Sequence, residues 1–235
     1  MDLFDKVYGC IVGLAVGDAF GMPGQMSPER SRELYGEITS FLEPPPDDPV
    51  HGGFKAGQVT DDTLAALAIL RSVIRTGRLS LEDIARSLVE WIDEVDGLNL
   101  SYVGPSTKRA ILRLKQGVPP REAGRHGWTN GASMRVAPLG FLHPGDLEAT
   151  VEAAEIASMP THNTNTAISG AAAVACAVSR CAVGGSTIAE VVEAARWGAE
   201  LGARRGHRYI CPSIPRRIDM AVQLASSDKG IQEKQ

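Results

Sequence analysis

The chain has 235 residues, and 43% of them are hydrophobic, which is enough to build one sizeable globular core. Its formal net charge is −4 and it has no dense run of Lys or Arg, which argues against an electrostatic surface for nucleic acid or membranes. We therefore expect neither a nucleic-acid partner nor a membrane partner.

The N-terminus and the cysteines predict a cytoplasmic protein. Residues 1–5, with the sequence MDLFD, are acidic and lack the positive region of a signal peptide. No uninterrupted run of about 18 apolar residues occurs, as a membrane-spanning helix would need. Cys10, Cys176, Cys181 and Cys211 form no CxxC pair, and the first three lie in apolar helical patterns, which is typical of buried free thiols in a reducing compartment.

Apolar residues recur at steps of three and four along most of the chain, which predicts helices and no sheet. Gly- and Pro-rich loops separate them at 20–26, 43–59 and 122–133, and loops of this length are often functional. We expect a compact, orthogonally packed all-α globule that forms a single domain over residues 1–235. The expected helices cover about 3–21, 60–76, 81–95, 105–116, 146–158, 164–183, 187–204 and 213–225.

The first helix carries two unusual features. Gly9, Gly13, Gly17 and Gly21 are spaced by four residues, and such a stripe predicts close contact with a second helix. Asp18 lies among apolar residues of the same helix. Since a buried carboxylate needs a partner, Asp18 is expected to make either a structural hydrogen bond or a contact at a metal site.

The most informative local motif is Thr60-Asp61-Asp62-Thr63, directly before an apolar helix. Hard divalent cations such as Mg²⁺ and Mn²⁺ prefer oxygen ligands, and adjacent carboxylates in a first helical turn could bridge two ions or hold one beside a substrate oxygen. The alternative is an ordinary acidic helix start, with Thr60 as the N-cap and the carboxylates favoured by the helix dipole. The residues alone leave both interpretations open.

A second motif is the small-residue turn at 127–135, with the sequence GWTNGASMR. Backbone N–H groups in such a turn can cradle a phosphate, and Asn130 and Ser133 can add hydrogen bonds. A plain tight turn is the alternative. His162, which precedes the Ala-rich helix, is either a functional imidazole or incidental to helix capping by Thr161 or Asn163.

Taken in order, four segments resemble those of the ADP-ribosylglycohydrolase family, which includes the dinitrogenase-reductase-activating glycohydrolases. They are residues 13–23, 57–63, 129–138 and 161–162, and the resemblance runs from about residue 5 to 225. It implies an all-helical hydrolase with a binuclear Mg²⁺ or Mn²⁺ centre. Such an enzyme cleaves the N- or O-glycosidic bond between ADP-ribose and a modified side chain or small acceptor.

The resemblance also implies roles for individual residues, and the physical logic agrees, because charge develops on an oxocarbenium-like sugar during such a reaction. ADP-ribose or an ADP-ribosylated protein or small molecule is the implied partner. The implied roles are metal ligands at Thr60, Asp61 and Asp62, catalysis by Asp61 and Asp62, diphosphate binding at Asn130, Gly131 and Ser133, and a position near the ribose or diphosphate for His162.

The chain departs from the family pattern in three places. The second metal motif, Gly-Asp-x-Asp-Thr near the C-terminus, has no counterpart, so we expect a domain that is incomplete there and exposes apolar surface through which the chain could oligomerise. Gln25 stands where many relatives carry Glu, and Tyr102 where some carry Asp. Asp93, Glu94 and Asp96 lie close enough to Tyr102 in sequence to be candidate substitutes for that Asp.

Three functions therefore remain open at this level. The first is a metal-dependent hydrolase of ADP-ribosyl linkages or of a related N-riboside. The second is a catalytically impaired relative that binds ADP-ribose or a nucleotide, and the third is a helical scaffold protein that uses only the fold. An acidic cage around the substrate separates the first from the other two. The sequence does not distinguish the ribosyl linkage, or Mg²⁺ from Mn²⁺.

Overall fold

The computed structural model describes residues 2–227, and in that part of the chain it contains helices and loops but no strand. This confirms the predicted all-α class. Residue 1 and residues 228–235, which the predicted single domain included, lie outside the described part. The helices are α1 (Leu3–Gly21), η1 (Met22–Gly24), α2 (Pro28–Tyr35), α3 (Asp61–Thr76), α4 (Leu81–Glu94), α5 (Pro105–Lys115), α6 (Pro120–Ala123), η2 (Ser133–Arg135), η3 (Ala137–Phe141), α7 (Leu147–Ser158), α8 (Asn165–Val183), α9 (Ile188–Gly202) and α10 (Ile214–Ser226).

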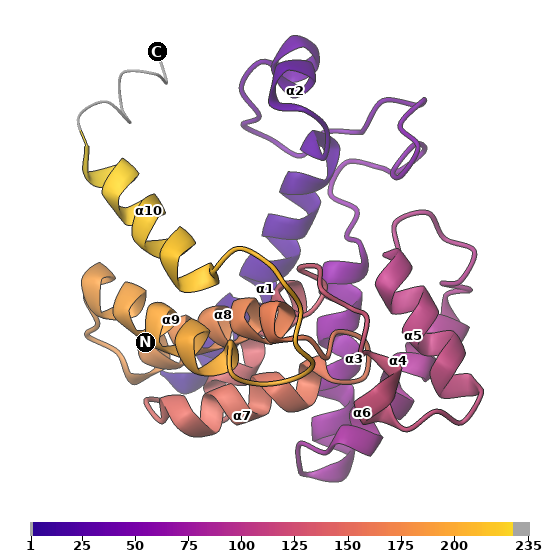
Figure 1. The fold of residues 1–235 in the computed structure, drawn as a ribbon. Coiled ribbons are helices and arrows are strands. Elements are labelled where there is room, and N and C mark those ends of the chain that lie inside the picture. Colours follow the sequence, from indigo (N-terminus) through magenta and orange to yellow (C-terminus); the bar gives the residue numbers. More distant parts are fainter. Residues whose placement is uncertain (1, 228–235) are drawn as a thin grey trace.

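Helix α8 is the centre of the core, and it packs against α7, α9 and η3 (Figure 1). Its buried face consists largely of small side chains, so neighbouring helices approach closely. A Cβ atom on Gly198 of α9 would lie 2.7 Å from the carbonyl oxygen of Ala172. Cys176 is buried in this core as a free thiol, whereas Cys181, which the sequence predicted to be buried, is exposed.

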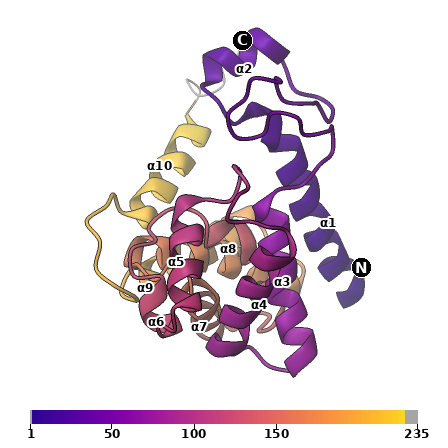
Figure 2. The ribbon, with the colours of Figure 1, turned by 90° about the vertical axis from the view of Figure 1, so that its right-hand side faces the viewer.

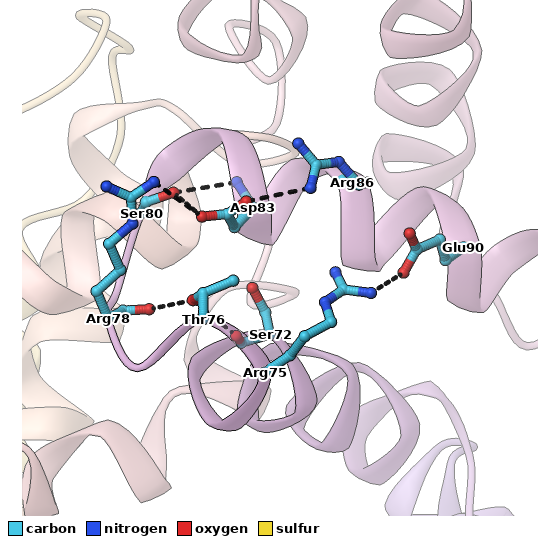
Figure 3. Close-up of polar contacts among 8 residues, drawn as sticks. All are labelled: Ser72, Arg75, Thr76, Arg78, Ser80, Asp83, Arg86 and Glu90. Carbon is cyan, nitrogen blue, oxygen red and sulfur yellow. Dashed lines mark hydrogen bonds and ion pairs between the residues drawn. The ribbon is translucent and has the colours of Figure 1, made fainter.

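Helices α3 and α4 form an antiparallel pair beside this core. α3 ends at Gly77, which adopts the left-handed conformation that favours glycine. Figure 3 shows the corner between the helices, where Ser80 caps α4 by accepting a hydrogen bond from the N–H of Asp83 at 3.2 Å. An exposed ion pair of 3.0 Å between Arg75 and Glu90 joins the two helices. The corner fixes one end of α3, and the carboxylates of the predicted metal motif lie at its other end.

Helices α1 and α10 both extend upward from the body, on opposite sides of it in Figure 2, and α2 lies beyond the end of α1 (Figures 1 and 2). The predicted close helix contact along the glycine stripe of α1 is wrong, because a Cβ atom on any of its four glycines would meet nothing within 4 Å in the described residues. Large apolar side chains on both helices are exposed, including Phe4, Tyr8, Met220 and Leu224. Exposed apolar surface was expected, and oligomerisation through it stays a prediction.

Two helical segments are long and apolar enough to cross a membrane, judged by length and composition alone. One is α8, the core helix described above, and the other comprises residues 3–24. α1 makes up most of that second segment, and near its end Asp18 is buried and hydrogen-bonded to the start of α3. A core helix of a globular protein passes this test as readily as a membrane span, so the expected absence of a membrane partner stays a prediction.

Candidate active site

The start of α3 is held by Asp18, whose carboxylate accepts four hydrogen bonds. Its Oδ1 accepts from the Thr60 hydroxyl at 2.7 Å, and its Oδ2 accepts from the Thr63 hydroxyl at 2.7 Å. The backbone N–H groups of Thr60 and Thr63 donate to Oδ2 at 2.8 and 3.2 Å. These bonds tie the end of α1 to the first turn of α3, so the partner that the sequence predicted for Asp18 is structural.

Asp61 and Asp62 occupy the first two positions of α3, and we call this pair the acidic wall. Burial raises the pKa of Asp61 to about 7, and the neighbouring charge of Asp62 adds to the effect. Burial and the charge of Asp18 raise the pKa of Asp62 to about 6. In the described residues no Lys, Arg or His nitrogen lies within 4.0 Å of either carboxylate. Asp61 is therefore buried, and Asp62 partly buried, without a direct counter-charge.

A second wall is formed by the turn at 127–131, which lies against the segment at 159–163. A Cβ atom on Gly127 would lie 2.1 Å from the Thr161 carbonyl oxygen, and one on Gly131 would lie 2.5 Å from Cε1 of His162. Neither position therefore has room for a side chain. We call the turn and the His162 ring the glycine wall, and its geometry requires hydrogen in place of a side chain at these two positions.

The N–H groups of this turn are available to a ligand. Within the described part of the chain, those of Asn130, Gly131 and Ala132 donate to no protein acceptor. Asn130 and Gly131 line the cavity described below, so their N–H groups can reach a ligand there, whereas Ala132 is fully buried and does not line it. Successive free N–H groups in a turn can form a concave anion site, and the phosphate binding that the sequence predicted for this motif stays a prediction.

His162 is buried beside this turn and hydrogen-bonded through both ring nitrogens. Nδ1 lies 2.8 Å from the Thr161 hydroxyl oxygen, and Nε2 lies 3.0 Å from that of Thr129. Burial, with the nearby charge of Arg135, lowers the pKa of His162 to about 3. The ring is therefore neutral at physiological pH.

The two walls line one cavity of about 170 Å³. It brings together Asp61, Asp62, Asn130, Gly131 and His162 from segments far apart in sequence. The remaining lining residues are Gln25, Tyr102, Gly104, Ser106, Thr107, Thr129 and Met134.

Two predicted site residues lie outside this lining. Thr60 is buried, and its hydroxyl donates to Asp18 while accepting from the N–H of Asp62 at 3.5 Å. The side chain of Ser133 is directed toward α8, because a Cβ atom on Gly170 would lie 2.7 Å from its Oγ. The assigned roles of Thr60 and Ser133 stay predictions.

Seven lining positions were not proposed as site residues from the sequence, and four of them are Tyr102, Ser106, Thr107 and Thr129. Ser106 and Thr107 follow Gly104-Pro105 at the start of α5, and a hydroxyl pair at a helix start was their signal. Tyr102 is supported by the loop at 43–59, because its ring meets that of Phe54 edge to face with centroids 5.2 Å apart. The fourth is Thr129, which directly precedes the Asn-Gly turn.

The candidate substitutes for the Asp that Tyr102 replaces lie elsewhere. Asp93 pairs with Lys115, Glu94 pairs with Arg71, and Asp96 accepts hydrogen bonds from Asn99, and none of the three lines the cavity. Gln25 and Tyr102 do line it, so the positions that depart from the family pattern face the site. Within residues 2–227 no group of three or more His, Cys, Asp or Glu side chains is arranged to hold a metal ion.

Trp128, the residue before Thr129, lines a second cavity of about 410 Å³. The rings of Trp128 and Tyr209 are stacked there, with centroids 5.5 Å apart and planes 5° from parallel. The other lining residues are cationic or titratable, and they are Arg109, Arg125, His126, His207 and Arg208. Aromatic faces beside guanidinium groups suit the base and phosphates of a nucleotide.

Comparison with known proteins identifies the family of this chain. The family model described as ADP-ribosylglycohydrolase matches residues 1–234. The chain belongs to the ADP-ribosylglycohydrolase family. Among its relatives, the uncharacterised protein YegU of Escherichia coli (strain K12) is 31% identical over 229 residues, which cover 96% of this chain and 68% of YegU.

Two further matches support membership of the ADP-ribosylglycohydrolase family. The ADP-ribosyl-(dinitrogen reductase) glycohydrolase of Rhodospirillum rubrum is 32% identical over 157 residues, which cover 63% of this chain and 49% of that enzyme. A solved ADP-ribosylglycohydrolase-related protein complex superposes with a TM-score of 0.62 at 25% identity, covering 86% of this chain and 64% of that one. The chain thus spans between half and about two thirds of the length of these matched proteins.

Proposed function

We propose that this chain forms the ligand-binding part of a hydrolase that cleaves the glycosidic bond of ADP-ribosylated substrates. The observation that carries the proposal is the single cavity shared by the acidic wall and the glycine wall. Carboxylates there suit a ribose and the positive charge that develops on it, and the free N–H groups suit a diphosphate. Family membership and the Rhodospirillum rubrum relative supply the reaction class.

The acidic wall fits a divalent cation. Asp61 and Asp62 supply anionic oxygens whose pKa values burial has raised, and a bound cation would relieve that cost. The amide oxygen of Gln25 and a lone pair of Thr60 could complete part of the set, with water at the remaining positions. We propose that these residues hold Mg²⁺ or Mn²⁺, which when bound polarises the ribose oxygens and orients water.

The side chains of this chain have distinct parts in the proposed reaction. An ionised carboxylate of the acidic wall can accept a proton from the attacking water. The same carboxylates stabilise an oxocarbenium-like ribose by their negative charge. Asn130 and Gly131 hold the diphosphate, and the neutral His162 ring fixes the position of the turn without adding charge.

The adenosine part of the ligand extends to the second cavity. A cavity of about 170 Å³ holds a ribose with adjacent phosphate groups, whereas a complete nucleotide needs more space. Trp128, which belongs to the turn assigned to the diphosphate, lines the second cavity. We therefore assign the base to the surface around Trp128 and Tyr209.

Calorimetric titration of the 235-residue chain with ADP-ribose, with and without Mg²⁺ or Mn²⁺, tests this proposal. Binding should strengthen at least tenfold with the metal, and Asp61→Asn should abolish that gain. The matched control is Asp5→Asn, which makes the same chemical change on an exposed residue near the start of α1. Absence of ADP-ribose binding in every condition would contradict the proposal.

A second candidate function is ADP-ribose binding without hydrolysis. This candidate is favoured by Gln25, which lines the cavity at a position where many relatives carry Glu. The amide of Gln25, unlike the carboxylate of Glu, cannot accept a proton. An assay that measures the release of ADP-ribose from ADP-ribosylarginine distinguishes the two candidates. Metal-dependent binding without product release would assign the chain to the binding class.

A further inference from the structure

A line of hydrogen bonds leads from a buried arginine to the cavity. The Nη2 of Arg135 donates to the Thr161 hydroxyl at 2.7 Å, Thr161 contacts Nδ1 of His162 at 2.8 Å, and Nε2 of His162 contacts the Thr129 hydroxyl at 3.0 Å. Arg135, Thr161 and His162 are at most 1% exposed. Thr129 is the member of this line that lies partly open, and it lines the cavity.

Donor and acceptor roles along this line follow from the chemistry of its first member. A guanidinium group only donates, so the Thr161 oxygen accepts from Arg135. The Thr161 hydroxyl is fully buried, and the described residues offer its proton no acceptor other than Nδ1 of His162, so it donates to Nδ1, which is then unprotonated. Because the ring is neutral, its proton resides on Nε2, which donates to the Thr129 oxygen.

The consequence falls on Thr129. Its oxygen accepts from His162, so its own hydroxyl proton remains available, and the described residues offer this hydroxyl no other hydrogen-bond partner. The free N–H groups of Asn130 and Gly131 follow directly along the same turn. Thr129 therefore adds one more donor to a row of donors that faces the same cavity.

We propose that Thr129 is a ligand-binding residue whose hydroxyl donates a hydrogen bond to a phosphate oxygen, and that Arg135, Thr161 and His162 are positioning residues that fix this direction of donation. The inference deepens the proposed function, since the phosphate belongs to the ADP-ribosyl ligand named there. In this assignment His162 contacts the ligand through Thr129, whereas the sequence placed His162 itself next to the ribose or diphosphate.

The test compares wild type with Thr129→Val, which keeps the shape and removes the hydroxyl, and with Thr129→Ser, which keeps the hydroxyl. Binding of ADP-ribose and of inorganic pyrophosphate is measured by calorimetry. A hydrogen bond to a charged acceptor predicts roughly 10- to 100-fold weaker binding of both ligands by Thr129→Val. Thr129→Ser should restore most of the affinity, and Thr39→Val, an exposed matched control, should change nothing.

Nitrogen NMR of the His162 ring gives a readout that needs no ligand. We expect a proton on Nε2 and none on Nδ1 in wild type, and a ring proton on Nδ1 would overturn the inference. Unchanged binding by Thr129→Val, while wild type binds ADP-ribose, would overturn the assignment of Thr129 alone. If wild type bound neither ADP-ribose nor pyrophosphate, the proposed function and the assignment would both be overturned.

Discussion

In the acidic wall, the buried Asp61 and the partly buried Asp62 have no direct counter-charge in the described residues, whereas in the glycine wall both ring nitrogens of His162 have hydrogen-bond partners. The charge of Arg135 reaches Asp61 only at longer range, without an ion pair. One wall therefore carries an electrostatic cost that a bound cation removes, and the other is preorganised by close packing. Metal affinity and ligand positioning in this cavity therefore have separate physical origins, and each can be changed without the other.

The largest expected effect comes from breaking the glycine wall. Gly127→Ala puts a methyl group 2.1 Å from the Thr161 carbonyl oxygen, so the turn must move away from the 159–163 segment. We expect a loss of about 3 kcal/mol in the free energy of unfolding, together with loss of ADP-ribose binding. Chemical denaturation and calorimetry measure the two effects.

The matched control for that substitution is Gly13→Ala. Gly13 lies in a helix, and a Cβ atom there meets nothing within 4 Å. Alanine has the higher helix propensity, so this variant should be more stable than wild type by about 0.5 to 1 kcal/mol. Equal destabilisation by both substitutions would contradict the role given to close packing at Gly127.

An intermediate effect is expected where the acidic wall is anchored. Asp18→Asn replaces an acceptor-only group with one that also donates, so at least one of the donors from Thr60 and Thr63 loses its acceptor. We expect destabilisation by about 2 kcal/mol and weaker metal binding, because the first turn of α3 loses its anchor. Unchanged metal affinity in a destabilised variant would separate the anchor from the metal site.

The smallest expected effect, and one of opposite sign, comes from removing charge within the acidic wall. The pKa of Asp61 is about 7 in the folded chain and near 3.8 when unfolded, so the protonated side chain favours the folded state. That contribution is complete below pH 3.8 and is lost as the pH rises through about 7. Without metal, Asp61→Asn should therefore be more stable than wild type at pH 8, by on the order of 1 kcal/mol.

Denaturation curves between pH 4 and 8, recorded with a metal chelator, check this prediction. The advantage of Asp61→Asn should shrink toward pH 4, where the wild-type carboxyl is protonated. Adding Mg²⁺ at pH 8 should stabilise wild type and leave the variant unchanged. A variant that is less stable than wild type at every pH would instead favour a purely structural role as an acidic helix start.

The sequence predicted the helices well because apolar periodicity is a local property. The start of α3 was placed within one residue, since Thr60 and the two carboxylates are strong N-terminal signals. Short α2 was missed because its eight residues carry no apolar repeat. The helix contact predicted from the glycine stripe of α1 was wrong, because the spacing of glycines alone does not indicate whether a second helix lies opposite them.

The site was predictable as separate motifs but not as an assembly. Asp18 bonds to residues 42 and 45 positions away, and no local pattern encodes that distance. Thr129 was overlooked because its role depends on the His162 ring, which comes 33 residues later. The sequence indicates which groups can do chemistry, whereas the packing of the loops decides which of them meet.

The close packing at Gly127 and Gly131 also limits how this cavity can evolve. A side chain at Gly127 would have to move the backbone, and one at Gly131 would have to displace the buried His162 ring, so neither position can adjust which ligand is bound without disturbing the wall. Between them, Trp128 and Asn130 are exposed and Thr129 is partly open. New ligand preferences can therefore arise at three consecutive positions while the backbone that holds them stays fixed, which makes this short turn the natural target for redesigning what the cavity binds.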